Sequence, residues 1–152
     1  MKVKVLIKSE QIFDDHKEQE EHICDGEIQY LKNGIVLEFV EKFEQQELHF
    51  KMNILKEKVI INRQNQAMIL DYNKDDNCKV ATPYGIMKMK VHTTNIKITN
   101  KQELIQELLL EYDISLENNI QYGNRVIIKL EYWQIDIYKK LKSILLSFLD
   151  LH

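Results

Sequence analysis

The stretch VATPYGIMKMKVHTTNIKIT, Val80–Thr99, decides the fold of this chain. It holds the single proline of the 152 residues, Pro83, two positions before Gly85, at the start of a long run in which apolar and polar residues alternate. Proline fixes its own φ and cannot donate a backbone hydrogen bond, and it favours an extended conformation at the preceding Thr82. Glycine accepts a positive φ that other residues resist. We therefore predict that Thr82, Pro83 and Gly85 form a structural corner between a short strand and a long one.

The long run that follows the corner changes its phase partway along. Its apolar residues are odd-numbered up to Val91 and even-numbered from Ile96 onward. Because a slip of one residue moves every side chain of a strand to the other face, a β-bulge is predicted within His92–Asn95. Long strands that bend in this way allow a sheet to curl into a barrel.

The same alternation recurs elsewhere, in Val3–Ile7, Leu48–Ile54, Leu108–Leu116 and Val126–Leu130. Successive side chains of a strand point to opposite faces, so each run predicts a strand with one buried face and one wet face. This pattern is typical of antiparallel sheets, because parallel strands that are buried on both faces are apolar throughout.

Short polar segments separate these runs, and the clearest is KNG at 32–34, which predicts a hairpin. Strands and turns alternate from Gly26 to Trp133 without a helical pattern between them. A meander of this kind hides its edge strands best by closing on itself. We predict an all-β, antiparallel barrel of roughly 8–10 strands, formed as one domain by residues 1–133.

Residues 134–152 follow a different pattern. In WQIDIYKKLKSILLSFLDLH, which begins at Trp133, apolar residues recur at the spacing of one helical face, opposite lysines and serines. This predicts a C-terminal amphipathic helix that packs on or beside the barrel. A dimer contact and a membrane-surface role are the alternatives. The apolar patches are too short to span a bilayer.

Composition and charge disfavour several functions. The net charge is −3, with acidic and basic residues interspersed, whereas a domain that grips nucleic acid through its phosphates normally carries a basic face. The first residues, MKVKVLIKSE, lack the continuous apolar run of a signal peptide. Cys24 and Cys78 do not have the spacing of a metal or redox motif and are predicted to be reduced thiols. We therefore expect a cytoplasmic protein that does not bind nucleic acid.

Four segments, GEIQYLKNGIVLEFVEKF, LHFKMNILKEKVIINR, ATPYGIMKMKVHTTNIKI and LLLEYDISL, resemble in their order the YwiB-like bacterial proteins. The resemblance covers roughly residues 1–131, and its most specific part is TPYG at 82–85 with Thr93 or Thr94 in the strand that follows. It implies a calycin-like β-barrel, related in shape to lipocalins and fatty-acid-binding proteins. The family is uncharacterised, so the resemblance implies no activity.

Weaker parts of the resemblance are Glu41, Arg63 and Tyr112. Proteins of the family usually have a glycine shortly after the arginine, whereas this chain continues with Gln64–Gln66. This departure concerns the type of turn and not the fold.

Few residues are arranged for catalysis or metal binding. The chain has no Gly-x-Ser-x-Gly elbow and no glycine-rich phosphate loop. Asp14–Cys24 contains two histidines, several carboxylates and a thiol, but His16 and His22 share neither a helical face nor a strand face. We predict a solvated, disordered connection there between the first two strands, and no metal site. Tyr84 and His92 flank the expected barrel mouth and are the acid and base of a disfavoured enzyme hypothesis.

The predicted interior favours a binding function. An eight-stranded barrel is filled by side chains or holds one small ligand, and further strands make a cavity plausible. We expect a small apolar or amphipathic molecule in the barrel and no cofactor. The alternative is a ligand-free module that binds another protein or a second copy of itself. The candidate ligand-binding residues are Phe50, Met52, Tyr84, Met87, Met89 and Tyr112.

Overall fold

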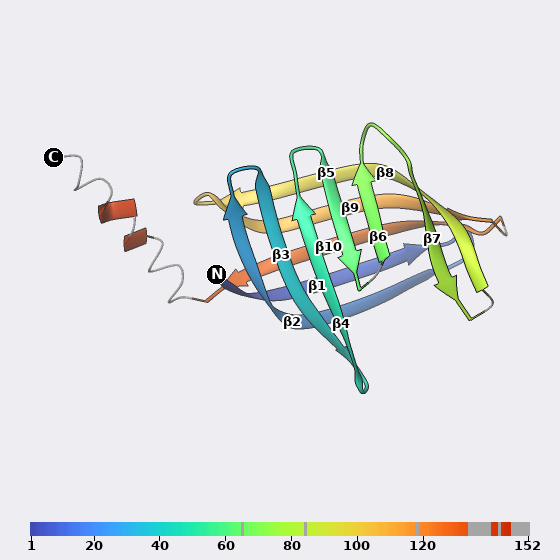
Figure 1. The fold of residues 1–152 in the computed structure, drawn as a ribbon, viewed down its shortest axis with the longest axis horizontal. Coiled ribbons are helices and arrows are strands. Elements are labelled where there is room, and N and C mark those ends of the chain that lie inside the picture. The colour runs from blue at the N-terminus through green and yellow to red at the C-terminus, as the bar shows by residue number, and fades with distance from the viewer. Residues whose placement is uncertain (65, 84, 118, 134–140, 143, 147–152) are drawn as a thin grey trace.

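The computed structural model describes residues 1–64, 66–83, 85–117, 119–133, 141–142 and 144–146. Its strands form one antiparallel sheet that curls into a nearly closed barrel, so the predicted fold class is confirmed (Figure 1). The strands are β1 (Lys2–Ile12), β2 (Lys17–Leu31), β3 (Gly34–Phe43), β4 (Gln46–Ile54), β5 (Lys58–Arg63), β6 (Gln66–Asp71), β7 (Asp76–Thr82), β8 (Gly85–Lys101), β9 (Leu104–Leu116) and β10 (Gln121–Tyr132).

The strand order is β6-β5-β4-β3-β2-β1-β10-β9-β8-β7. Strands that are consecutive in sequence therefore pair with each other, except for β6 and β7. In addition, β1 pairs with β10. The first and last strands pair along nearly their whole length, from Val3 opposite Tyr132 to Ile12 opposite Gly123. The consecutive strands β6 and β7 are the two ends of the sheet. The first and last strands are thus paired inside the sheet, and its two edge strands come from the middle of the sequence. We call the junction between β6 and β7 the seam.

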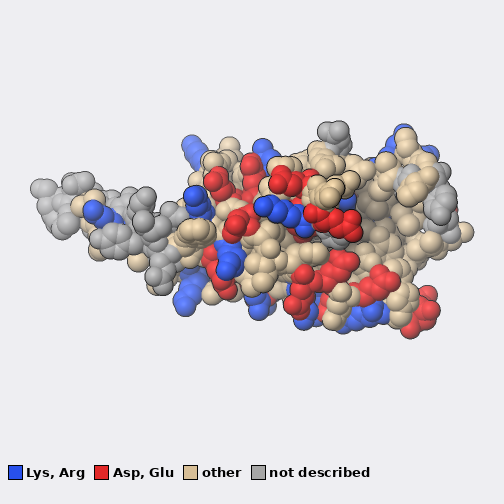
Figure 2. Space-filling model, turned by 90° about the horizontal axis from the view of Figure 1, so that it is seen from below, with Lys and Arg blue, Asp and Glu red and all other residues tan. Residues whose placement is uncertain are grey.

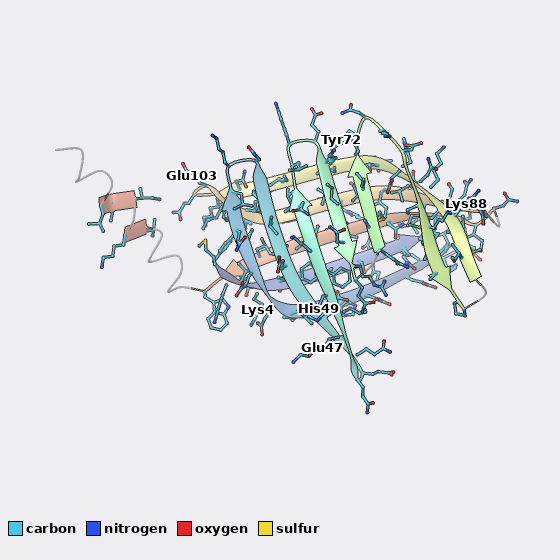
Figure 3. The ribbon with its side chains drawn as sticks, in the orientation of Figure 1. Lys4, Glu47, His49, Tyr72, Lys88 and Glu103 are labelled. Atoms are coloured by element: carbon cyan, nitrogen blue, oxygen red, sulfur yellow. The ribbon has the colours of Figure 1, made fainter. Side chains whose placement is uncertain are left out.

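Side chains, and not a backbone ladder, join the seam between β6 and β7. The backbone N–H of Ile69 donates to Asp76 Oδ2 at 2.9 Å. The hydroxyl of Tyr72, in the loop after β6, lies 2.8 Å from the carbonyl oxygen of Ile96 and 3.0 Å from Asn95 Oδ1. It also accepts the N–H of Ile96. These contacts hold β6 against β7 and β8 at one end of the seam, where Figure 3 labels Tyr72.

The corner and the bulge that the sequence predicts are both present. β7 ends at Thr82, Pro83 lies in the turn, and Gly85 starts β8 with a φ of +117°. The register between β8 and β9 shifts between Thr93 and Asn95. The bulge therefore lets the apolar residues on both sides of it face the interior. Tyr84 lies outside the described residues.

The connection between the first two strands is much shorter than the sequence predicts. We expected all of Asp14–Cys24 to be a disordered loop, but β2 begins at Lys17 and pairs with β1 from its first residue. Only residues 13–16 form the turn, and the N–H of Phe13 donates to the carbonyl oxygen of His16 at 2.9 Å. The prediction was wrong because β1 supplies a continuous partner whose hydrogen bonds do not depend on the polarity of the β2 side chains.

The core consists mainly of aliphatic side chains from nearly all strands. Its fully covered members include Val3, Val5, Ile28, Leu37, Val59, Leu70 and Leu108. The outside is polar, and acidic and basic side chains are interspersed on the face shown in Figure 2.

The predicted extension at 134–152 falls largely outside the described residues. Of this segment, residues 141–142 and 144–146 are helical, and Leu141, Leu145 and Leu146 are exposed. Within the described part of the chain, no helix has the length and apolar character needed to cross a membrane.

Candidate functional site

The barrel contains a cavity of about 420 Å³, and all ten strands contribute to its wall. Much of the wall is apolar, and aliphatic residues share it with aromatic and methionine side chains. The rings of Phe39 and Phe50 stack there with their centroids 5.0 Å apart. The principal apolar lining residues are Phe39, Phe50, Met52, Met68, Met89 and Leu110.

Strands β1, β8, β9 and β10 carry a row of uncharged polar side chains across this wall. Cross-strand pairing places Gln11 of β1 opposite Asn124 of β10, Asn124 opposite Tyr112 of β9, and Tyr112 opposite Thr93 of β8. The first three of these residues line the cavity. We call Gln11, Asn124, Tyr112 and Thr93 the polar row.

Two members of the polar row carry buried polar atoms without a partner. Asn124 is only 9% exposed and Thr93 only 5%. Among the described residues, neither Asn124 Nδ2 nor Thr93 Oγ1 finds a hydrogen-bond partner. A buried polar group without a partner is destabilising by about 1–3 kcal/mol, so the row has hydrogen-bonding capacity that the described protein does not use.

Tyr112 holds the centre of the polar row as a neutral phenol. Burial, with a smaller contribution from the neighbouring Tyr122, raises the pKa of its hydroxyl to about 12. The hydroxyl therefore keeps its proton at neutral pH and remains a hydrogen-bond donor.

Charged side chains surround the open end of the cavity. Glu20, Glu41, Arg63 and Lys79 all belong to its lining, together with His22, whose Nε2 lies 3.2 Å from Glu20 Oε2. Two carboxylates face two permanent cations here, so this rim is close to neutral overall.

The cavity reaches solvent along the seam. Gln66 and Ala67 of β6 and Lys79 of β7 line the cavity and are exposed. The Ile69–Asp76 bridge holds these two strands together farther along. The seam is therefore bridged at Ile69 and Asp76, and the exposed lining residues Gln66 and Lys79 mark a candidate lateral entrance.

The two cysteines differ in their relation to the cavity. Cys78 is part of the lining, whereas Cys24 lies outside it and its Sγ is 3.9 Å from the carbonyl oxygen of Val5. Both thiols are free. Burial raises the pKa of Cys78, and Asp76 adds to this effect. Burial, Glu41 and Asp25 raise the pKa of Cys24 to about 11.

A second hollow, of about 630 Å³, lies on the outside of β1–β5 beside Trp133. Outward-facing charged strand residues such as Glu27, Glu38 and Lys51 supply much of its lining. Val3 and Phe39 form a buried apolar floor, but in the described structure none of the lining residues carries a buried polar atom without a partner, so the interior cavity is the stronger candidate site.

The structure places four of the six predicted binding residues on the cavity wall: Phe50, Met52, Met89 and Tyr112. Met87 shares the inward phase of Met89 but does not line the cavity, and Tyr84 lies outside the described residues. A role in ligand binding stays a prediction for all six.

Glu41, Arg63 and Tyr112, which the family resemblance singled out, all line the cavity. Sequence reasoning missed Gln11 and Asn124. The signal was available, because Asn124 shares the even phase of the apolar Val126 and Ile128 and is a polar residue at an inward position.

Of the two residues of the enzyme hypothesis, Tyr84 lies outside the described residues, so the structure gives only the orientation of His92. His92 points away from the interior, because Val91 and Thr93 on either side of it are buried. Its Nδ1 lies 2.7 Å from Asp75 Oδ1 on the outside of the barrel. No group of three or more potential metal-binding side chains forms within the described residues.

Comparison with known proteins supports the fold and gives a family. The crystal structure of the ywiB protein from Bacillus subtilis matches with a TM-score of 0.66 and 13% sequence identity, over 86% of this chain and 92% of that one. At this identity the likeness concerns the fold alone. No curated protein matches the chain significantly in sequence. The model of the family described as "Domain of unknown function (DUF1934)" matches residues 5–128. This match covers most of the chain, which therefore belongs to the DUF1934 family.

Proposed function

We propose that the barrel binds a small amphipathic molecule in its interior cavity. The observation that carries this proposal is the mixed character of the wall, in which apolar side chains, aromatic and methionine residues among them, meet the polar row. A molecule with an apolar body and a polar end matches both. The volume of about 420 Å³ lies in the range of small-molecule pockets, about 300–1,000 Å³.

The character of the wall supports binding more than simple core packing. Methionine side chains adapt to irregular ligands, and Met52, Met68 and Met89 meet the stacked rings of Phe39 and Phe50 around one space. Barrels of the lipocalin kind hold one small ligand in the same position.

The seam supplies a route for the ligand. Strands β6 and β7 share no backbone ladder, so they can separate near Gln66 and Lys79 without loss of backbone hydrogen bonds between them. Both cysteines are free thiols, which supports a role in the reducing cytoplasm.

A second candidate function is an interaction module that acts through residues 134–152. The observation that favours it is the exposure of Leu141, Leu145 and Leu146 in the described part of this segment. Such side chains gain free energy when a second copy or another protein covers them. Truncation after Trp133 tests this function, because an unchanged assembly state would rule out the segment as the interface.

Native mass spectrometry of the purified protein is the first test of the binding function. A discrete extra mass that is lost on denaturation supports it, and analysis of the released compound gives the chemical class. The same spectrum shows whether the protein is a dimer.

A fluorescence titration with 1-aminoanthracene, a small apolar reporter, completes the test. Val80→Trp places a bulky ring on the cavity wall and should abolish the fluorescence increase. Ala81→Trp is the matched control, since Ala81 is exposed on the same strand and does not line the cavity. Equal reporter binding by both variants, or none by the wild type, would contradict binding in this cavity.

A further inference from the structure

The polar row narrows the chemical class of the ligand, and this step rests on the proposed function. Asn124 lines the cavity, is about nine-tenths buried, and has an amide nitrogen without a partner among the described residues. The amide can turn by half a rotation at little steric cost, because its oxygen and nitrogen are nearly equal in size. Either orientation leaves amide hydrogen-bonding capacity in the cavity wall.

The neighbours of Asn124 on this wall do not satisfy the amide. Gln11 and Tyr112 flank it in the cross-strand register, and no side-chain hydrogen bond joins the three residues in the described structure. Tyr112 adds a hydroxyl that stays protonated at neutral pH. The centre of the row therefore offers at least two donors, an amide N–H and a phenol O–H, to one side of the cavity.

The polar row lacks a cation. Gln11, Asn124, Tyr112 and Thr93 are all uncharged, and the permanent cations of the lining, Arg63 and Lys79, belong to the strands near the seam. A carboxylate placed on the row would lose its hydration without gaining an ion pair, which is far less favourable than burial of a neutral group. A neutral oxygen or amide can use the same donors at lower desolvation cost.

We propose that the polar end of the ligand is an uncharged amide or alcohol, which hydrogen-bonds Asn124 and Tyr112 while the apolar body lies against Phe39, Phe50 and the methionines. The ligand group supplies the acceptor that the Asn124 N–H lacks in the described protein. The polar row then discriminates against acids of the same chain length, since it offers donors but no counter-charge.

Displacement of 1-aminoanthracene by three ligands with the same alkyl chain tests this assignment on the full-length protein. Decanamide and decan-1-ol should displace the reporter at concentrations about tenfold lower than decanoate at pH 7.5, a difference of about 1.4 kcal/mol. Decanoate that competes as well as decanamide would overturn the assignment.

Asn124→Leu gives the residue-level test. The variant keeps the approximate volume and removes a buried unpartnered amide, so its Tm should stay equal or rise. It should lower the affinity for decanamide about tenfold relative to the affinity for the reporter. Asn77→Leu, the same change at an exposed position that faces outward from β7, is the matched control. Tyr112→Phe, which removes one oxygen only, should lower the affinity for decanamide several-fold. It serves as the test if Asn124→Leu does not fold.

The outcomes separate this inference from the function on which it rests. Absence of reporter binding by the wild type contradicts the cavity as a binding site and the inference with it. Reporter binding together with equal decanamide affinity in wild type, Asn124→Leu and Tyr112→Phe contradicts the inference alone and leaves the binding function in place.

Discussion

The hydroxyl groups of Tyr30 and Tyr132 hydrogen-bond each other across the closed end of the barrel, although 102 positions separate them in the sequence. The pair also holds the backbone of Ile105, whose N–H donates to Tyr30 at 2.9 Å and whose carbonyl accepts from Tyr132 at 2.8 Å. Three strands, β2, β9 and β10, are thus joined at the end opposite to the open rim. Burial and the hydrogen bond from Tyr30 raise the pKa of Tyr132, so the Tyr132 hydroxyl keeps its proton at neutral pH.

Tyr132→Phe should lower the free energy of unfolding by about 1–3 kcal/mol, because the buried carbonyl of Ile105 loses its donor. Urea denaturation followed by fluorescence measures the effect. Tyr122→Phe is the control, since the described residues provide no hydrogen-bond partner for the Tyr122 hydroxyl, and it should change stability by less than about 0.5 kcal/mol. Equal effects of the two changes would show that the hydrogen bonds of the Tyr132 hydroxyl do not stabilise the fold.

Gly26→Ala should also be destabilising, by about 1–3 kcal/mol. A Cβ at Gly26 would lie 2.7 Å from the carbonyl oxygen of Glu38 and 2.9 Å from Val5 Cγ2, and the first of these is a backbone atom that cannot rotate away. Thermal unfolding checks the prediction. Gly123→Ala is the control, because its nearest contact would be an ordinary 3.4 Å to Asp113. A Tm of Gly26→Ala equal to that of the control would contradict the close approach of β2 and β3.

These two features mark the limit of prediction from the sequence. Alternation gave the inward phase of most strands, and the shift between Val91 and Ile96 gave the bulge, because both depend on residues that are near each other in the chain. The Tyr30–Tyr132 pair depends on the pairing of the first strand with the last. The narrow space at Gly26 depends on how closely the neighbouring strands β1 and β3 approach β2. The residues themselves carry no local signal for either arrangement.

The first half of β2 was missed for a related physical reason. Lys17–Cys24 lacks apolar alternation, because its inward residues Glu18 and Glu20 face the wet, open end of the barrel and not the core. The candidate site, too, was predictable only in part. Its apolar wall, with Phe50 and Met89, follows from strand phase, whereas the position of the seam beside Cys78 does not.

His16 should titrate above its ordinary pKa. Its Nδ1 lies 2.7 Å from Asp15 Oδ1, and this hydrogen bond, together with Glu18, raises the pKa of the imidazole. The turn therefore gains stability from the protonated ring at pH values below about 6.5, and loses it as the pH rises through the higher folded pKa. An NMR titration measures this value. Asp15→Asn should lower it and Asp14→Asn, an exposed neighbour, should not; identical titration curves would show that Asp15 does not act on the ring.

The two thiols should report separately on the cavity. In a Cys24→Ser variant, 1-aminoanthracene should slow alkylation of Cys78 by N-ethylmaleimide, because Cys78 lines the cavity that the reporter fills. In a Cys78→Ser variant, the reporter should leave the rate at Cys24 unchanged. Both rates should be slow at pH 7 and increase with pH, since burial raises the pKa of each thiol. Equal protection of both cysteines would indicate stabilisation of the whole fold and not occupation of the cavity.

Tyr72→Phe should loosen the seam. The hydroxyl accepts the N–H of Ile96 and contacts the bulge of β8 from the loop after β6, so its removal takes away a bridge beside the seam. We expect a loss of about 1 kcal/mol in stability, faster hydrogen exchange at the Ile96 amide, and faster release of 1-aminoanthracene in stopped-flow experiments. Asp76→Ala removes the bridge at Ile69 and should have the same effect on release. If both variants release the reporter at the wild-type rate while Ile96 exchanges faster, the seam opens but the ligand leaves by the rim, and the lateral entrance is wrong.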